Sequence, residues 1–242
     1  MKIFDVYLFE TTTSELVKSL LDDLKHKNKK LLAFANVNTL NISYEDMSYS
    51  KILKNFLVVN DGVGVDIAAK ILYRKTFKEN LNGTDFMPIF LASLPEHTNI
   101  FIYGSIEKNI KLVENKIINQ FKNINVVGVQ NGYITDNGKL VSMINESMAD
   151  IVIVGLGNPK QEFWIMDNYI DVHASIFIGV GAFFDFYSGE VNRSPLWVRK
   201  IRMEWLFRLF LEPKRLWKRY LYGNIIFLLR IITNHNFKYK PF

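Results

Sequence analysis

Short apolar runs recur along the first three quarters of the chain, and stretches with helical spacing separate them. The runs are rich in Val, Ile and Phe and are bounded by turn residues, which is typical of strands buried on both faces of a parallel sheet. This alternation predicts an α/β fold, with a doubly wound and mostly parallel Rossmann-like sheet. The six runs are LLAFANV (31–37), FLVVN (56–60), NIFIYG (99–104), NVVGVQ (125–130), DIVIVGLG (150–157) and SIFIGVG (175–181).

The clearest helical segments between these runs cover residues 14–27 and 107–121. In the first, Leu16, Leu20 and Leu24 recur one helical turn apart, and Ser14 is the expected N-cap.

Charge divides the chain into two parts. Residues 193–242 hold seven Arg and five Lys against two Glu, a net charge of +10, whereas residues 1–192 have a net charge of −4. The change coincides with a change from alternating strands and helices to a basic, aromatic, helical run. We therefore expect an α/β catalytic domain over residues 1–194 and a basic amphipathic helical appendage over residues 195–242.

Composition excludes several other classes of protein. Hydrophobic residues make up 49% of the chain, which excludes a disordered protein. The chain has no cysteine, so it has no disulfide framework and no thiolate metal site. The first ten residues, MKIFDVYLFE, do not form a signal peptide, and no apolar stretch is long enough to span a membrane. The composition is typical of a cytoplasmic protein.

Glycine and polar residues follow most of the predicted strands. In parallel sheets these carboxyl ends are where ligands bind, and glycine lets a ligand approach the backbone. Such turns contain glycine in many proteins without a ligand, but their recurrence beside polar residues favours a nucleotide or phosphate site. Neither a complete dinucleotide fingerprint nor a Walker A sequence occurs, which weighs against a dehydrogenase or a P-loop enzyme. The positions are Asn36, Asn38, Asp61, Gly62, Gly104, Gly155 and Gly157.

Five longer motifs occur in an order and spacing that resemble the WecG/TagA/CpsF glycosyltransferases (glycosyltransferase family 26). The resemblance runs from about Leu31 to Asn224, and its GLGxPKQE and EPxRLxxRY elements are specific. It implies an inverting, metal-independent enzyme without a cofactor. The reaction implied moves a sugar, by default N-acetylmannosamine, from UDP to a GlcNAc carried on polyprenyl diphosphate. The motifs are VNDGVGVDIA (59–68), LNGTDF (81–86), IVGLGNPKQEFWI (153–165), IGVGAFFDFYSGEVNRSPLW (178–197) and EWLFRLFLEPKRLWKRYLYGN (204–224).

The resemblance assigns the catalytic base to Asp61, at the end of a buried strand where a carboxylate can reach an acceptor hydroxyl. The alternative is that Asp61 caps a helix that begins near Gly64. Asp66 is expected to be a solvated helix residue. Gly83 and Asp85, in the NGTD element, match family positions in the substrate site, although Asp85 is equally suited to capping a helix that starts at Phe86.

Two positions depart from the family pattern. The family usually has Thr-x-Asn where this chain has Asn36 and Asn38, so Asn38 matches and Asn36 replaces the threonine. Many members also carry an arginine where this chain has Asn80, and Lys75 and Lys78 are the nearby cations that could replace it. The alternative role for the two asparagines at 36 and 38 is closure of a turn.

The GLGNPK element places Gln161 at the start of a helix, where the helix N-terminus favours an anionic diphosphate. The resemblance puts this glutamine in the donor pocket, although Pro159 suits helix initiation and explains part of the motif. Asp185 and Tyr187 either line the same pocket or belong to the core. The four histidines are scattered, and no metal site is predicted.

The C-terminal run combines basic residues with Trp, Tyr and Phe in helical spacing, as in helices that lie in a membrane interface. The alternatives are packing on the domain or on a second subunit of a homo-oligomer. Nucleic-acid binding is disfavoured by the motif order and by the acidic N-terminal part. The resemblance implies that Arg208, Arg215 and Arg219 complete the active site over the diphosphate.

Together these observations predict a peripheral enzyme on the cytoplasmic face of the cell membrane. It would use a UDP-sugar donor and a lipid-diphosphate-linked sugar acceptor to build an envelope polysaccharide such as teichoic acid, capsule or exopolysaccharide. A different donor, such as UDP-glucose, is the first alternative. A Rossmann-type oxidoreductase and a basic membrane or nucleic-acid adaptor are more distant alternatives.

Overall fold

The computed structural model of the chain describes residues 1–200 and 203–238. Residues 201–202 and 239–242, which belong to the predicted appendage, lie outside the described residues.

One eight-stranded sheet forms the centre of the molecule, with the strand order β1-β2-β4-β3-β8-β7-β5-β6. All neighbouring strands are parallel except β1, which pairs with β2 in an antiparallel direction. The predicted α/β class and mostly parallel sheet are confirmed. The strands are β1 (Lys2–Ile3), β2 (Val6–Phe9), β3 (Lys30–Ala35), β4 (Leu57–Asn60), β5 (Thr98–Gly104), β6 (Ile124–Gln130), β7 (Ile151–Gly155) and β8 (Ile176–Gly179).

The last six strands coincide with the six apolar runs of the sequence to within a few residues at each end. The N-terminal pair β1 and β2 was not predicted, because β1 has only two residues and Asp5 interrupts the apolar pattern. In β2, Val6 and Leu8 are buried whereas Tyr7 and Phe9 are exposed, which is the alternation of a strand near a sheet edge.

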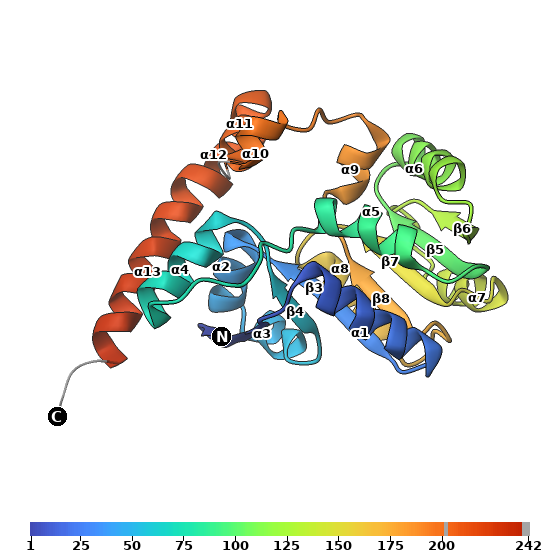
Figure 1. The fold of residues 1–242 in the computed structure, drawn as a ribbon, viewed down its shortest axis with the longest axis horizontal. Helices are drawn as coiled ribbons and strands as arrows, with labels where there is room; N and C mark the ends of the chain where they lie inside the picture. Colours follow the sequence, from blue (N-terminus) through green and yellow to red (C-terminus); the bar gives the residue numbers. More distant parts are fainter. Residues whose placement is uncertain (201–202, 239–242) are drawn as a thin grey trace.

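Helices cover both faces of the sheet (Figure 1). They are α1 (Thr13–Lys25), α2 (Val37–Glu45), α3 (Met47–Leu53), α4 (Val63–Tyr73), α5 (Gly83–Ser93), α6 (Glu107–Gln120), α7 (Asn137–Glu146), α8 (Lys160–Asn168), α9 (Phe183–Ser188), α10 (Leu196–Lys200), α11 (Glu204–Leu211), α12 (Pro213–Trp217), a π-helical turn η1 (Lys218–Tyr222) and α13 (Gly223–Lys238).

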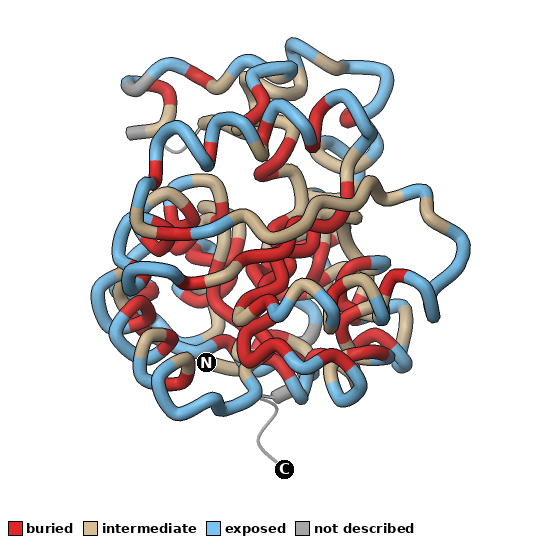
Figure 2. Tube along the Cα trace, turned by 90° about the vertical axis from the view of Figure 1, so that its right-hand side faces the viewer, coloured by how far each residue is buried: buried red, intermediate tan, exposed pale blue. Residues whose placement is uncertain are grey.

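Each face of the sheet has its own hydrophobic core, because successive strand residues point to opposite faces. In β7, for example, Val152 and Val154 pack into one core and Ile151 and Ile153 into the other. The first core includes residues of α2, α3, α4, α7, α8 and α13, and the second includes residues of α1, α5, α6 and α9. The buried residues accordingly concentrate in the middle of the molecule (Figure 2).

The N-cap of the first helix lies two residues before the expected one. Thr12, not Ser14, is the N-cap of α1: its side chain accepts from the Glu15 N–H, and the Glu15 carboxylate accepts from the Thr12 N–H at 2.9 Å. This reciprocal pair is a capping box, which satisfies two amide groups at once.

The C-terminal helix α13 returns along the outside of the domain and packs on α2 and α4 (Figure 1). Its Phe227 and Ile231 are fully buried in the first core. Arg230 of α13 donates to Asn41 at 3.0 Å and forms an ion pair of 2.6 Å with Glu45. The predicted appendage therefore contributes to the core of the α/β domain, and its description as a separate unit beginning at residue 195 stays a prediction.

Among the described residues, the model has no helix that combines the length and the apolar character needed to cross a membrane.

The packing of α13 predicts a specific loss of stability. Phe227→Ala should lower the free energy of unfolding by about 3–5 kcal/mol, because Phe227 is buried and its removal leaves a cavity. Phe210→Ala is the matched control, since Phe210 is 76% exposed and should change the stability little. Urea denaturation of both variants tests this. Equal stabilities of the two would contradict the packing of α13.

Candidate active site

A large cleft of about 1620 Å³ lies along the carboxyl ends of the parallel strands. The turns that follow β3, β4, β5, β7 and β8 form one side of it. Residues of α10, α11, α12 and the start of α13 form the other side. These helices gather at one end of the molecule in Figure 1, joined to α9 by an extended segment. The cleft thus lies between the α/β layers and the basic C-terminal helices.

Asp61 lies at the end of β4, where its backbone N–H donates to the Ala35 carbonyl of the neighbouring strand at 2.9 Å. Burial raises the pKa of the Asp61 carboxyl from 3.8 to about 6. A hydrogen bond from the Asn36 side chain at 3.4 Å and the positive charges of Arg219 and Arg208 partly oppose this rise, whereas Glu204 adds to it. Asp61 is therefore a carboxylate whose protonation changes close to neutral pH.

The turn after Asp61 explains why Asp61 does not cap the next helix. Gly62 is the N-cap of α4, with φ at +89°, and no side chain caps this helix. The Gly62 N–H instead donates to the Asn80 side-chain oxygen at 2.6 Å. Asn80 therefore fixes the glycine turn beside Asp61.

Neither Lys75 nor Lys78 takes over the charge that is missing at Asn80. Lys75 pairs with Glu10 at 2.7 Å and Lys78 pairs with Glu15 at 3.3 Å, and neither lysine lines the cleft. The two lysines that the sequence offered as replacements therefore lie outside the cleft. Their partners Glu10 and Glu15 hold them near β2 and α1.

The two asparagines after β3 both line the cleft. Asn36 is the N-cap of α2, where its side-chain oxygen accepts from the N–H groups of Asn38 and Thr39 at 3.0 and 3.2 Å. Its side-chain nitrogen donates to Asp61. One amide thus begins α2 and orients the candidate base, and the role of Asn36 and Asn38 in binding substrate stays a prediction.

The three predicted arginines, Arg208, Arg215 and Arg219, all line the cleft. The Arg208 guanidinium lies 4.8 Å from the centre of the Phe186 ring, and Arg215 pairs with Glu212 at 2.8 Å. Within the described part of the chain, no carboxylate lies within ion-pair distance of Arg208 or Arg219. The cleft therefore brings the positive charges of Arg208 and Arg219 close enough to act on the Asp61 carboxylate.

Asp85 lines the cleft, and its carboxylate forms ion pairs with arginines of the C-terminal segment. Its carboxylate lies 2.5 Å from Arg193 and 3.5 Å from Arg199, and Arg193 also approaches Glu204 at 3.7 Å. Asp85 does not cap a helix at Phe86, because α5 begins at Gly83 and Asn82 is its cap. Asp85 thus connects α5 to the segment that carries the basic helices.

Gln161 lines the cleft but is almost fully buried, and its amide is engaged within the protein. Its oxygen accepts from the Gly157 and Gly181 N–H groups at 3.2 and 2.9 Å, and its nitrogen donates to Glu162 at 2.7 Å. The predicted role of this amide in recognising uracil or a sugar hydroxyl is therefore not supported by its contacts.

The predicted glycines differ in position. Gly62, Gly83, Gly155 and Gly157 line the cleft. Gly104 does not: with φ at +132°, it packs so closely on the Gly155 backbone that an added Cβ would lie 2.4 Å from the carbonyl oxygen. Gly104 is therefore required for the contact between neighbouring turns rather than for contact with a ligand.

Several lining residues were missed or misjudged from the sequence. Asn109 and Tyr133 line the cleft, and no motif includes them; Glu204 also lines it and begins the last motif, but no role was predicted for it. Ser105, which follows Gly104 at the end of a predicted strand, also lines the cleft, and its hydroxyl donates to Asp185 at 3.4 Å.

The structure also separates residues that the sequence treated alike. Asp185 lines the cleft, whereas the Tyr187 hydroxyl bonds to Gln120 at 2.6 Å and lies outside it. Asp66, expected to be solvated, is buried in the first turn of α4.

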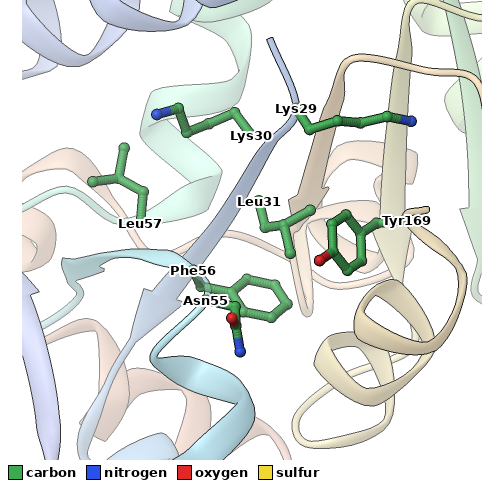
Figure 3. Close-up of a pocket in the computed structure, with 7 residues that line it drawn as sticks. All are labelled: Lys29, Lys30, Leu31, Asn55, Phe56, Leu57 and Tyr169. Carbon is green, nitrogen blue, oxygen red and sulfur yellow. The ribbon is translucent and has the colours of Figure 1, made fainter.

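A second hollow, of about 340 Å³, lies at the amino ends of β3 and β4 (Figure 3). Lys29 and Lys30 extend to opposite sides of the strand there. Lys29 donates to the carbonyls of Val172 and Ala174, and Lys30 pairs with Asp23 at 3.3 Å. Both lysines are thus engaged by the fold, and this hollow holds no group of catalytic side chains. Nowhere in residues 1–200 and 203–238 do three or more potential metal-ligating side chains converge.

Comparisons with known proteins agree with the motifs. The model of the "Glycosyl transferase WecG/TagA/CpsF family" matches residues 1–241. Two curated relatives are each named "N-acetylglucosaminyldiphosphoundecaprenol N-acetyl-beta-D-mannosaminyltransferase". The relative from Bacillus subtilis (strain 168) is 33% identical over 180 residues, which cover 73% of this chain and 69% of the relative. The relative from Bacillus spizizenii (strain ATCC 23059 / NRRL B-14472 / W23) is 30% identical over 165 residues, which cover 68% and 63%.

The environment of Asp61 predicts how activity depends on pH. If Asp61 accepts a proton, kcat/KM should rise as the pH increases through about 6 and level off above it, because only the ionised carboxylate is a base. Asn36→Leu should move this midpoint to higher pH, since it removes the hydrogen bond that lowers the pKa of Asp61. A pH–rate profile of both proteins measures this.

The same pKa fixes the sign of an effect on stability. Because the folded pKa lies above 3.8, ionisation of Asp61 opposes folding, and this cost is fully present above about pH 6. Asp61→Asn should therefore raise the Tm at pH 8, with no gain at pH 3. A lower Tm for the variant at pH 8 would contradict the burial of this charge.

Proposed function

The chain belongs to the WecG/TagA/CpsF family and is a glycosyltransferase, and from this premise we propose which reaction its cleft performs. The enzyme transfers N-acetylmannosamine from UDP to a GlcNAc unit linked to polyprenyl diphosphate. The names of the two relatives, 33% and 30% identical, support this donor sugar and acceptor. The product would serve the synthesis of a bacterial envelope polysaccharide.

One observation supports the proposal most directly: a carboxylate with a raised pKa and a group of arginines line the same cleft. Asp61 comes from the end of β4, and Arg208 and Arg219 come from the C-terminal helices. Their charges influence each other, since both arginines lower the pKa of Asp61. Inverting glycosyl transfer requires both components, a base for the acceptor hydroxyl and positive charge for the departing diphosphate.

In the proposed step, the acceptor hydroxyl attacks the anomeric carbon from the face opposite UDP. Asp61 takes the hydroxyl proton as the new C–O bond forms. The bond from the anomeric carbon to the β-phosphate oxygen breaks, and its electron pair stays on UDP. Arg208 and Arg219 stabilise this developing charge, because fixed positive charges act on a phosphate more strongly inside a cleft than in bulk water. Arginine suits the task, since its planar fork of donors matches phosphate oxygens.

The remaining length of the cleft gives room for the nucleoside. From β4 the edge of the sheet continues across β3, β8, β7, β5 and β6, and neighbouring strands lie about 4.8 Å apart. The far end is lined by Ser105, Asn109 and Tyr133, which offer an aromatic ring and uncharged hydrogen-bonding groups. We place the diphosphate at the arginines and the uridine toward this far end.

The donor sugar lies near Asn36, Asn38 and Asp61 in this arrangement. Asn36 has two duties, capping α2 and donating to Asp61, so its replacement of the family threonine bears on the geometry of the base. UDP-glucose is therefore the alternative donor to include in a test.

We also propose that the enzyme docks on the cytoplasmic face of the membrane as a peripheral protein. The C-terminal helices expose a group of large apolar side chains, with Lys214 and Lys218 among them. Anionic headgroups attract each such lysine by about 1 kcal/mol. A surface of this kind would bring the cleft to a lipid-linked acceptor. The exposed apolar side chains are Phe210, Leu211, Trp217, Leu221, Tyr222, Ile225, Leu229 and Ile232.

The reaction is tested by measuring UDP release from a panel of UDP-sugars, with a GlcNAc-diphosphate-lipid analogue as acceptor. We expect turnover with UDP-N-acetylmannosamine, and a loss of about 100-fold or more in Asp61→Asn. Arg208→Ala should cost about 100-fold through kcat. Arg74→Ala is the control, because Arg74 is exposed outside the cleft.

Each outcome has a separate meaning. Turnover with UDP-glucose alone would replace the donor and keep the mechanism. Unchanged turnover in Asp61→Asn would remove Asp61 from its role as base. No turnover with any UDP-sugar would overturn the proposed reaction.

Membrane docking is tested by sedimentation with vesicles that contain phosphatidylglycerol. Replacing Trp217, Tyr222 and Ile225 by serine should weaken binding by about tenfold or more, because apolar side chains anchor interfacial helices. Ile170→Ser is the control, since Ile170 is exposed just after the C-terminal end of α8 and does not belong to the C-terminal helices. Equal binding of the triple variant and wild type would contradict docking. Light scattering would then show whether a second subunit covers this surface.

A further inference from the structure

A buried group of polar side chains lies directly beneath the floor of the cleft, at the start of α8. Gln161 and Glu162 are both at most 1% exposed. They belong to adjacent positions of the first turn, and Asn158 precedes them in the same loop. None of the steps derived above uses Glu162, although burying a carboxyl group is costly unless it is hydrogen-bonded.

Gln161 connects two loops that are far apart in the sequence. Its single side-chain oxygen accepts from the Gly157 N–H, in the loop between β7 and α8, at 3.2 Å. The same oxygen accepts from the Gly181 N–H, in the loop between β8 and α9, at 2.9 Å. Both glycines line the cleft and have left-handed backbone angles, with φ at +77° and +55°. Gln161 thus holds two glycine turns at a fixed separation.

The amide of Gln161 works in this way in only one orientation. If it were turned over, its NH₂ group would face two N–H donors, and both hydrogen bonds would be lost. Glu162 selects the correct orientation, because its Oε1 accepts from the Gln161 nitrogen at 2.7 Å. The same Oε1 accepts from the Asn158 side chain at 2.6 Å.

The backbone of β8 leaves room for this arrangement. An added Cβ at Gly179 would lie 2.8 Å from the Gln161 side-chain nitrogen, so the amide packs flat against a strand that has no side chain there. Burial raises the pKa of Glu162, but either protonation state leaves an oxygen that can accept from both amides.

We propose that Glu162 is a positioning residue, which orients the Gln161 amide so that its oxygen joins the β7–α8 and β8–α9 loops into one rigid floor for the donor. This inference deepens the proposed function and rests on it for the identity of the donor. The expected consequence is a split between kinetic constants. Loosening the two loops should raise KM for the UDP-sugar more than it lowers kcat, since Asp61 and the arginines stay in place.

The test combines hydrogen exchange with kinetics on the full chain. In Glu162→Leu, exchange at Gly157 and Gly181 should accelerate about tenfold or more, which corresponds to the loss of a hydrogen bond of about 1.4 kcal/mol. Glu162→Gln should keep the slow exchange, because its amide oxygen can still accept from Gln161 and Asn158. The double variant Glu162→Leu with Gln161→Leu should exchange no faster than Gln161→Leu alone, since Glu162 acts through Gln161.

Asn168→Leu is the matched control. Asn168 is buried on the same helix, donates to the Trp164 carbonyl at 2.7 Å and accepts from Asn137 at 2.7 Å, and it does not line the cleft. This variant should lower the Tm. It should leave hydrogen exchange at Gly157 and Gly181, and KM for the UDP-sugar, unchanged. It separates a general loss of stability from the loosening of the two loops.

Unchanged exchange in Glu162→Leu would overturn the proposal, and so would a Glu162→Gln variant as impaired as Glu162→Leu. Additive effects in the double variant would also contradict it. If Glu162→Leu does not fold, Gln161→Leu provides the test, because it removes the other partner of the same contact. Hydrogen exchange at Gly157 and Gly181 should accelerate equally in this variant, and unchanged exchange would overturn the proposal. Hydrogen exchange needs no substrate, so failure of the donor panel would leave this test intact.

Discussion

The return of the C-terminal chain onto the α/β domain is the contact on which the rest of the site depends. Phe227 and Ile231 of α13 are part of a core that the sheet begins to build with β1 and β2, and Arg230 fixes the same helix to α2. Because α13 is held there, the preceding helices lie over the carboxyl ends of the strands. A carboxylate from β4 and arginines from α11 to η1 thereby line one cleft. Without this packing the cleft would have only one side.

The sequence predicted the architecture well because the signals for it are local. Apolar runs bounded by turn residues mark β3 to β8, and the motifs that resemble the family place Asp61, Arg208, Arg215 and Arg219 among the residues that line the cleft. The N-cap of α1 was less predictable. Thr12 and Ser14 are two residues apart and both are good N-caps, and only the contact of Thr12 with Glu15 in the folded chain decides between them.

The roles of polar residues were harder to predict, because a role depends on partners that are distant in the sequence. Asp85 forms ion pairs with Arg193 and Arg199. Gln161 forms hydrogen bonds with Gly181 and Glu162. Asn80 accepts from Gly62, although the sequence presented it only as a missing arginine. Tyr133 joined the cleft through folding alone, since none of the motifs includes it.

The position of α13 also bears on how the molecule is made. Domains generally begin to fold during synthesis from the N-terminus, at about 5–20 residues per second. Asp61 and the strands β2 to β4 around it leave the ribosome early, whereas Arg208, Arg219 and the two core residues of α13 are synthesised much later. On the proposed mechanism, a growing chain therefore has its base long before it has the cations that complete the site. On the same mechanism, an unfinished molecule stays inactive until α13 has been synthesised and packs on the sheet.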